Sequence, residues 1–369
     1  AEALSFAVMQ RTRSVSAPRF YDVFHVRANL PFVSHLPYPG KGELTVDLPL
    51  EPWEDCPSDA DGFMFFREPR IAGTDDGWTA AWELEKGRVH MHTLPAEGTQ
   101  VVTARTPGGR GAVEMVMLRR EAKETTFQSA MDIVKEEAEP TIIGTEPLPI
   151  AGEGVQGVMA HLADGTQELA AVSFDGRPLE FSGVQTDARA VLLHKEGDQV
   201  TSAMLAQVTF AESDGFRIAL EQPGLLIYRR LDDSLRELVS LGEEPVACRV
   251  TDLTWADRAY LVNEEGKRTD RVRISDGGDL TITLEARQRL EVMQGRQQTG
   301  DAWREEQRER AAAEKAAREK AFRDEMHARA DAQLARAREY DVPDDYFTVI
   351  EAEDYTDRGV GWVRRGRNL

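Results

Sequence analysis

Cysteines are scarce in this sequence: Cys56 and Cys248 are the only two in 369 residues, and they lie far apart. Two cysteines cannot form a zinc ribbon, and such a pair specifies no disulfide framework, so we interpret them as unrelated, partly buried thiols. Long apolar runs are missing as well, because no stretch reaches the roughly 18 consecutive apolar residues that a membrane-spanning helix requires. The sequence therefore predicts a protein without a membrane span.

Basic residues are also fewer than acidic residues in this sequence. The chain has 65 acidic residues against 45 basic ones, which gives a formal net charge of −20 at pH 7. This charge repels nucleic acid phosphates and anionic membrane surfaces, so the sequence predicts no nucleic acid partner. An anionic sugar polymer would feel the same repulsion. A site for such a polymer therefore requires a local cluster of Arg, Lys and His against the overall sign.

Short alternating apolar runs, broken by turn dipeptides such as Asp175-Gly176, fill residues 5 to 290. The runs are rich in Val, Ile, Phe and Thr and lack helical apolar spacing, for example in 20–26 and 126–133. This pattern predicts a mainly β protein, an antiparallel β-sandwich of the supersandwich type. The Pro-, Gly- and Glu-rich segment 136–157 predicts a boundary between a central β-sandwich part, 1–140, and a second β-sandwich block, 141–295.

The composition changes after residue 295. Residues 296–341 are dominated by Ala, Glu, Arg and Lys, with opposite charges three and four positions apart. This predicts a long, charged and largely solvated helix; a coiled-coil partner is the alternative, although no sustained heptad of Leu or Ile is present. Val342-Pro343 ends the helix. The remaining segment, 342–369, predicts a truncated β segment, in which VIEAEDYTDRGVG resembles the first strand of a carbohydrate-binding module.

Three segments in the first 140 residues carry a second resemblance. They are RTRSVSAPRFYDVFHV at 11–26, GELTVDLPL at 42–50, and TTF at 125–127 followed by Glu139-Pro140. In order and spacing they resemble the central β-sandwich of heparinase II/III-type polysaccharide lyases. The resemblance implies a secreted or periplasmic lyase that acts by β-elimination on an anionic, uronic-acid-containing polysaccharide, such as a glycosaminoglycan or alginate.

In that family an α/α toroid precedes the sandwich and contributes most of the catalytic residues, and nothing in this sequence resembles it. We therefore expect that sequence upstream of Ala1 is missing. We also expect that a toroid comes from an upstream domain or a partner chain, and that this chain alone is an incomplete enzyme. The alternative is a noncatalytic carbohydrate-binding or structural β-sandwich protein, with the helix as a spacer.

The implied chemistry requires a cation near the uronate carboxylate and a Tyr or His within hydrogen-bond reach of the transferred proton. The densest such set begins with Tyr21 and His25, which we predict to be catalytic, and continues with Arg27 and Tyr38, which we predict to bind substrate. On an extended strand Tyr21, His25 and Arg27 would point to one face and Asp22 to the other. Partly exposed packing residues are the alternative interpretation.

Two candidate metal sites arise from histidines. The sandwich of the family often contributes a histidine to a structural zinc, and His35 is the nearest match, so a zinc here would need ligands from upstream of Ala1. His90 and His92 also share one side of a predicted strand. Because no third ligand accompanies them, we interpret them as surface histidines.

Overall fold

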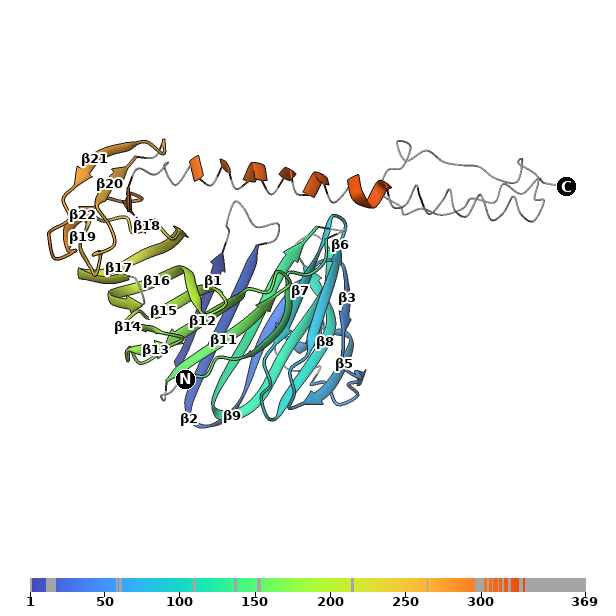
Figure 1. The fold of residues 1–369 in the computed structure, drawn as a ribbon. Coiled ribbons are helices and arrows are strands. Elements are labelled where there is room, and N and C mark those ends of the chain that lie inside the picture. The colour runs from blue at the N-terminus through green and yellow to red at the C-terminus, as the bar shows by residue number, and fades with distance from the viewer. Residues whose placement is uncertain are drawn as a thin grey trace, which may run out of the picture. The chain divides into compact units, whose positions relative to one another are not determined.

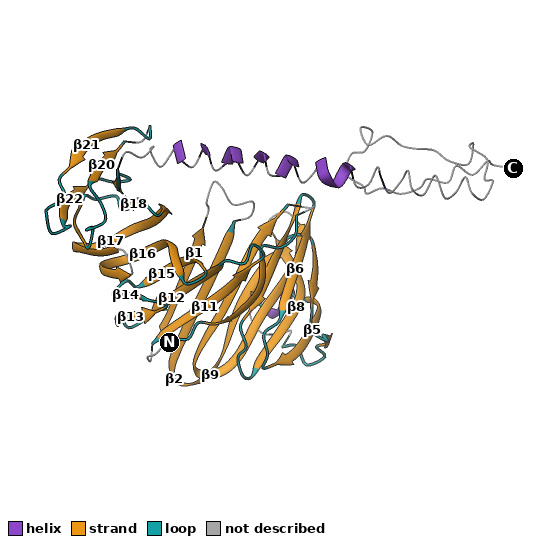
Figure 2. Ribbon diagram, in the orientation of Figure 1, coloured by secondary structure: helices purple, strands orange, loops and turns teal. Residues whose placement is uncertain are grey.

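The computed structural model describes residues 2–10, residues 18–295 and helical positions between 302 and 328. Short gaps in the second range fall at 58, 60–61, 109–110, 136–137, 151–153, 214–215 and 264. The chain is mainly β, with large antiparallel, sandwich-like sheets and a helix near its C-terminus, which confirms the predicted fold class (Figures 1 and 2). It divides into two units, Ala1–Gly300 and Asp301–Leu369.

The first sheet has nine strands and forks at its longest strand. Its strands are β1 (Glu2–Gln10), β2 (Arg19–Gly40), β3 (Glu43–Val46), β4 (Glu51–Pro52), β5 (Arg67–Thr74), β6 (Thr79–Leu84), β7 (Gly87–Thr93), β8 (Thr99–Gly108) and β9 (Gly111–Val134). One edge of β9 pairs with β2, and the other edge pairs with β8 at its start and with β7 at its end. Two arms therefore leave β9: β8-β5-β4 and β7-β6-β3.

The β2/β9 pair runs the length of the first sheet, from Arg19 opposite Asp132 to Gly40 opposite Glu114 (Figure 1). Its register shifts between Arg27 and Phe32, where extra residues bulge out of β2. Such a bulge lets a strand of 22 residues bend and twist while it stays in the sheet. The sequence could not show that its separate apolar runs form one strand.

The second sheet has fourteen strands, and all of its pairings are antiparallel. They are β10 (Ile142–Pro147), β11 (Val155–Leu162), β12 (Gln167–Ser173), β13 (Leu179–Phe181), β14 (Val184–Thr186), β15 (Ala190–Glu196), β16 (Gln199–Ser213), β17 (Phe216–Asp232), β18 (Leu235–Ser240), β19 (Val246–Thr251), β20 (Arg258–Val262), β21 (Arg268–Val272), β22 (Leu280–Leu284) and β23 (Arg289–Met293). The change of sheet falls between Val134 and Ile142, next to the predicted boundary at 140. Both sheets belong to one compact unit, so separate domains stay a prediction.

Small side chains line the contact between the two sheets. Ala130 of β9 packs with Ala160 of β11 and Ala170 of β12, all fully buried, beside Tyr21 and Val23 of β2. Alanines let the two backbones approach closely, and the larger residues fill the remaining space. The opposite face of the first sheet has its own core, built around aromatic residues that include Trp78, Trp82 and Phe127.

The second unit is described in part. Its described residues between Ala302 and Ala328 are helical, and all of them except the half-buried Trp303 are exposed. Glu305 and Arg308 form an ion pair of 2.8 Å one turn apart, as in a solvated charged helix. Residues 296–301 and 329–341 of the predicted helix lie outside the described residues, as does the predicted β segment 342–369. No helix within the described part of the chain is long and apolar enough to cross a membrane.

Candidate functional site

Tyr21 lies in a buried polar cluster that joins the two sheets. Glu168 of β12 is fully buried and accepts hydrogen bonds from Arg19 Nε at 2.8 Å, Arg19 Nη2 at 2.5 Å and the Tyr21 hydroxyl at 2.5 Å. His194 Nδ1 of β15 lies 3.4 Å from the same carboxylate. We call these four residues, Arg19, Tyr21, Glu168 and His194, the inter-sheet cluster.

In the inter-sheet cluster, the negative charge of Glu168 is stabilised by the groups around it. Burial alone would raise the pKa of Glu168, but hydrogen bonds from His194, Arg19 and Tyr21 and the charge of Arg19 outweigh it and lower that pKa to about 2. Burial, together with the charge of Glu168, raises the pKa of Tyr21 well above its ordinary value. Tyr21 therefore stays protonated, and its side chain is 1% exposed. In this position the hydroxyl holds the sheets together, and the catalytic role of Tyr21 stays a prediction.

His25 lies on the same face of β2, nearer to the bulge. Its Nδ1 is 3.0 Å from the Thr126 hydroxyl, and its Nε2 is 3.5 Å from the Glu124 carboxylate. The ring stacks on Phe174, which follows β12, with a centroid separation of 4.7 Å. Burial lowers the pKa of His25, and the nearby Arg27 adds to this, although Glu124 acts in the opposite direction. The imidazole is therefore neutral at neutral pH and able to accept a proton.

Arg27 lies next to His25, across Glu124. Its side chain is 72% exposed, and its Nε is 3.8 Å from the second oxygen of Glu124. The shared face predicted for Tyr21 and His25 is confirmed, because both side chains contact residues of the second sheet. The structure thus places the mostly buried ring of His25, whose side chain is 12% exposed, beside the exposed Arg27, near the bulge of β2.

Tyr38 lies on the other face of the first sheet, with Asp22. The Tyr38 hydroxyl donates to Asp22 Oδ2 at 3.0 Å and lies 3.2 Å from the Ser129 hydroxyl. Burial raises the pKa of Tyr38, as does the charge of Asp22. Asp22 therefore points away from the His25 side, as predicted. Tyr38 does not join His25 and Arg27, and its predicted role in substrate binding stays a prediction.

His35 lies on β2 beyond the bulge, where its ring packs edge-on against Phe63 with centroids 5.4 Å apart. Burial lowers its pKa, and the charge of Arg119 lowers it further. Within the described residues, no group of three His, Cys, Asp or Glu side chains could hold a metal ion. The predicted zinc depends on ligands upstream of Ala1 and stays a prediction.

His90 and His92 are half-buried on β7, so the interpretation as surface histidines needs correction. They face β9, where His90 is opposite Asp132 and His92 is opposite Ala130. Burial lowers the pKa of both imidazoles. The sequence could not show this, because it depends on which strand pairs with β7.

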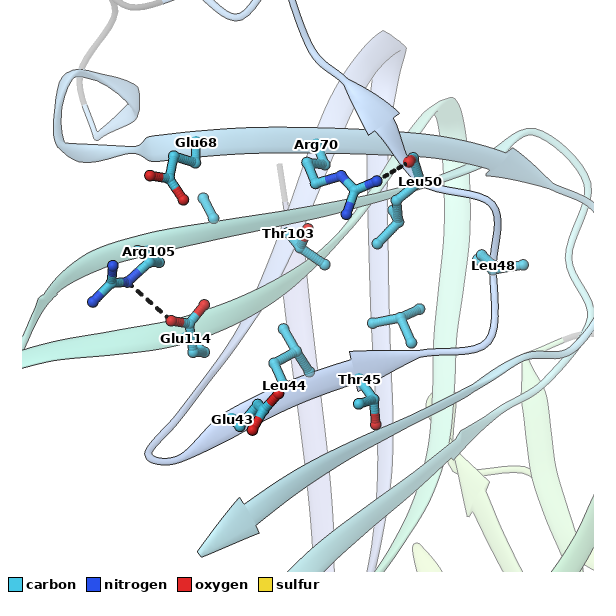
Figure 3. Close-up of a pocket in the computed structure, with 12 residues that line it drawn as sticks. Glu43, Leu44, Thr45, Leu48, Leu50, Glu68, Arg70, Thr103, Arg105 and Glu114 are labelled. Atoms are coloured by element: carbon cyan, nitrogen blue, oxygen red, sulfur yellow. Dashed lines mark hydrogen bonds and ion pairs between the residues drawn. The ribbon is translucent and has the colours of Figure 1, made fainter.

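A cleft that the sequence did not indicate lies between the two arms of the first sheet (Figure 3). Its volume is about 480 Å³, and β3, β5, β8 and β9 all contribute to its walls. Arg70 Nη2 donates to the Leu50 carbonyl at 2.5 Å, and Arg105 forms an ion pair of 3.0 Å with Glu114. The only signal in the sequence is the pair of arginines in Arg67-Glu68-Pro69-Arg70, on a strongly acidic chain.

No family model matches this chain, and no curated protein matches it. The resemblance to heparinase II/III-type lyases is therefore carried by the quoted segments alone.

Proposed function

We propose that this chain is the β-sheet portion of a polysaccharide lyase that acts by β-elimination on a uronic-acid-containing polysaccharide outside the cytoplasm. The observation that carries the proposal is the position of the His25 imidazole, held by Thr126 and sharing Glu124 with the exposed guanidinium of Arg27. Burial lowers the pKa of His25, which favours the neutral form. The two groups match the two requirements of the reaction. A guanidinium pairs with the uronate carboxylate, and a neutral imidazole accepts the adjacent proton.

The proposal assigns only part of the chemistry to this chain. β-Elimination also needs groups that stabilise the charge developing on the carboxylate and that protonate the leaving oxygen. Tyr21 and Tyr38 are both hydrogen-bonded to carboxylates, which leaves neither hydroxyl available for that task. In the proposed arrangement a helical toroid, from an upstream domain or a partner chain, supplies the missing groups.

The proposal is tested by following the His25 ring signals by NMR while a mannuronate trisaccharide is added. We expect the His25 signals to shift with the wild type and to stay unchanged with Arg27→Ala. Arg249→Ala is the matched control, because Arg249 is similarly exposed and paired with one carboxylate, in the second sheet. An unchanged His25 signal in the wild type would contradict the proposal.

A second measurement tests the missing groups. The chain alone is mixed with alginate, heparan sulfate, chondroitin sulfate and ulvan, and the absorbance of an unsaturated uronate product is followed. We expect no product, because the chain lacks the proposed toroid groups. Rapid turnover by the chain alone would show that essential groups are already present and would overturn this part of the proposal.

The second candidate function is a noncatalytic β-sandwich that binds or displays sugar chains. The burial of Tyr21 and the carboxylate partners of both tyrosines favour it, since neither residue is placed to move a proton. It predicts that the trisaccharide binds but that no unsaturated product forms, even after the toroid portion of a related lyase is added in trans. Product formation under those conditions would favour the lyase.

A further inference from the structure

A bulge in β5 places two arginines on one face of the strand. Arg67 is opposite Arg105 of β8 and Arg70 is opposite Thr103, so three steps on β5 match two steps on β8. Without the extra residue, Arg67 and Arg70 would point to opposite faces. Glu68 lies in the bulge, and its backbone adopts the left-handed conformation, with φ +52°. A non-glycine residue in this conformation costs energy, and such strain is concentrated at functional sites.

The arginines form a local positive cluster on a protein of net charge −20. Arg67 and Arg105 are direct cross-strand neighbours of like charge, an arrangement that is destabilising by itself. Glu114 neutralises Arg105. Neither Arg67 nor Arg70 has an ion-pair partner within the described residues. The cluster is therefore suited to a ligand that brings negative charge with it.

Two hollows meet at this cluster. The cleft between the arms contains Arg70 and Arg105, as Figure 3 shows, and a second hollow of about 490 Å³ contains Arg67 and Arg105. The second hollow also contains Phe65, whose side chain is 51% exposed. Each hollow is large enough for a small ligand, and Arg105 lines both. We call the two hollows together the groove.

The groove is far from His25. Arg67, Arg105, Glu114 and Gly40 form one cross-strand row at the end of β2, whereas His25 is opposite Thr126. Glu114 and Thr126 are twelve residues apart on β9, which corresponds to roughly 35–40 Å along an extended strand. A ligand in the groove therefore lies outside the site proposed for proton transfer.

We propose that this groove, formed by Phe65, Arg67, Arg70 and Arg105, is a second binding site, for an acidic oligosaccharide. The guanidinium groups pair with uronate carboxylates, and the exposed ring of Phe65 packs against a sugar ring. The two contacts need a ligand with both charge and a flat apolar face, which a uronate chain has and a simple anion lacks. This site needs no proton transfer, so it does not depend on the lyase proposal.

The test is calorimetric titration with an alginate hexasaccharide, carried out in the Arg27→Ala background so that the site on β2 does not contribute. We expect binding that weakens as salt is added, because exposed charges are screened. Arg67→Ala and Arg105→Ala should each weaken binding about tenfold or more, since each removes charge-assisted hydrogen bonds. Phe65→Ala should weaken it as well.

Matched controls separate the groove from general surface effects. Arg249→Ala removes a comparably exposed arginine, and Phe322→Ala removes an exposed phenylalanine of the helix; neither should change the affinity. Maltohexaose, which is neutral, should not bind. Equal affinity of the Arg67 and Arg105 variants and their background would overturn the proposal. Equally tight binding of a hexaglutamate peptide would overturn the assignment to a sugar.

Discussion

Among single residues, Glu168 is one whose loss would leave a buried charge without its partner. Arg19 is 4% exposed, and Glu168 accepts two of its N–H groups. Replacing one member of a buried ion pair typically costs about 3–5 kcal/mol, because the remaining charge stays desolvated. We expect Glu168→Gln to lower the free energy of unfolding by about 3 kcal/mol in urea titrations. Asp279→Asn, which breaks an exposed pair with Arg249, should cost less than about 1 kcal/mol.

The pH dependence of stability follows from the same carboxyl group. The pKa of Glu168 is about 2 in the folded chain, against an ordinary value of 4.5. A carboxyl whose pKa is lowered by folding binds protons more readily in the unfolded chain, so its contribution is complete above pH 4.5 and decreases as the pH falls toward 2. The stability difference between the wild type and Glu168→Gln should therefore shrink over this range. A constant difference would contradict the assignment.

Gly40 is required by the indole ring beside it. A Cβ atom at this position would overlap the ring of Trp82, whose Nε1 donates to the Glu114 carbonyl at 3.2 Å. Overpacking of this kind typically costs about 1–3 kcal/mol, so Gly40→Ala should lower the melting temperature. Gly73→Ala in β5 is the control, since a Cβ there meets nothing within 4 Å. A similar loss in both variants would show that the contact with Trp82 does not cause the effect.

At the scale of elements, the bulge of β5 stores strain at Glu68. Glycine adopts positive φ without a steric cost, so Glu68→Gly should keep the bulge and raise the free energy of unfolding by about 1 kcal/mol. Glu43→Gly on β3, where the backbone is not left-handed, should have the opposite sign. A destabilised Glu68→Gly variant would mean that the Glu68 side chain makes an essential contact.

The positions of strands could be predicted from the sequence, but the lengths of the strands could not. The predicted run 20–26 lies within β2, and the predicted run 126–133 is only the last part of β9. Both strands continue well beyond these runs, because β2 and β9 pair with each other along most of their lengths. The local alternation of apolar residues indicates which residues can form a strand, whereas pairing with the partner strand determines where that strand ends.

The candidate site was predictable only within one strand. Alternation placed His25 and Tyr21 on one face of β2 and Asp22 on the other. The groups that set their chemistry, Glu168 and Phe174, come from the second sheet. No spacing within residues 19–40 could indicate them, because the contacts depend on how the two sheets pack. Composition required a local basic cluster only for an anionic polymer, and the position of the arginines on β5 and β8 could not be predicted because it depends on the bulge of β5.

At the scale of the whole molecule, the two sheets should unfold together. The inter-sheet cluster and the packed alanines around Ala130 bury one sheet against the other, so separating the sheets would expose a charge and an apolar surface. Trp78 reports on the first sheet and Trp255 on the second. In single-tryptophan variants the two fluorescence transitions should coincide in urea. Two separated midpoints would show independent folding units.

The fork at β9 restricts mispairing of the first sheet. A slip of one residue between β9 and β2 would turn Phe127 out of its core toward the second sheet, because alternate residues of a strand face opposite sides. If β9 slips in this way, its pairing with β7 and its pairing with β8 are also broken, since both strands share one edge of β9. An error at one ladder is thus penalised at two others, so the first sheet has one register in which all three ladders of β9 form together.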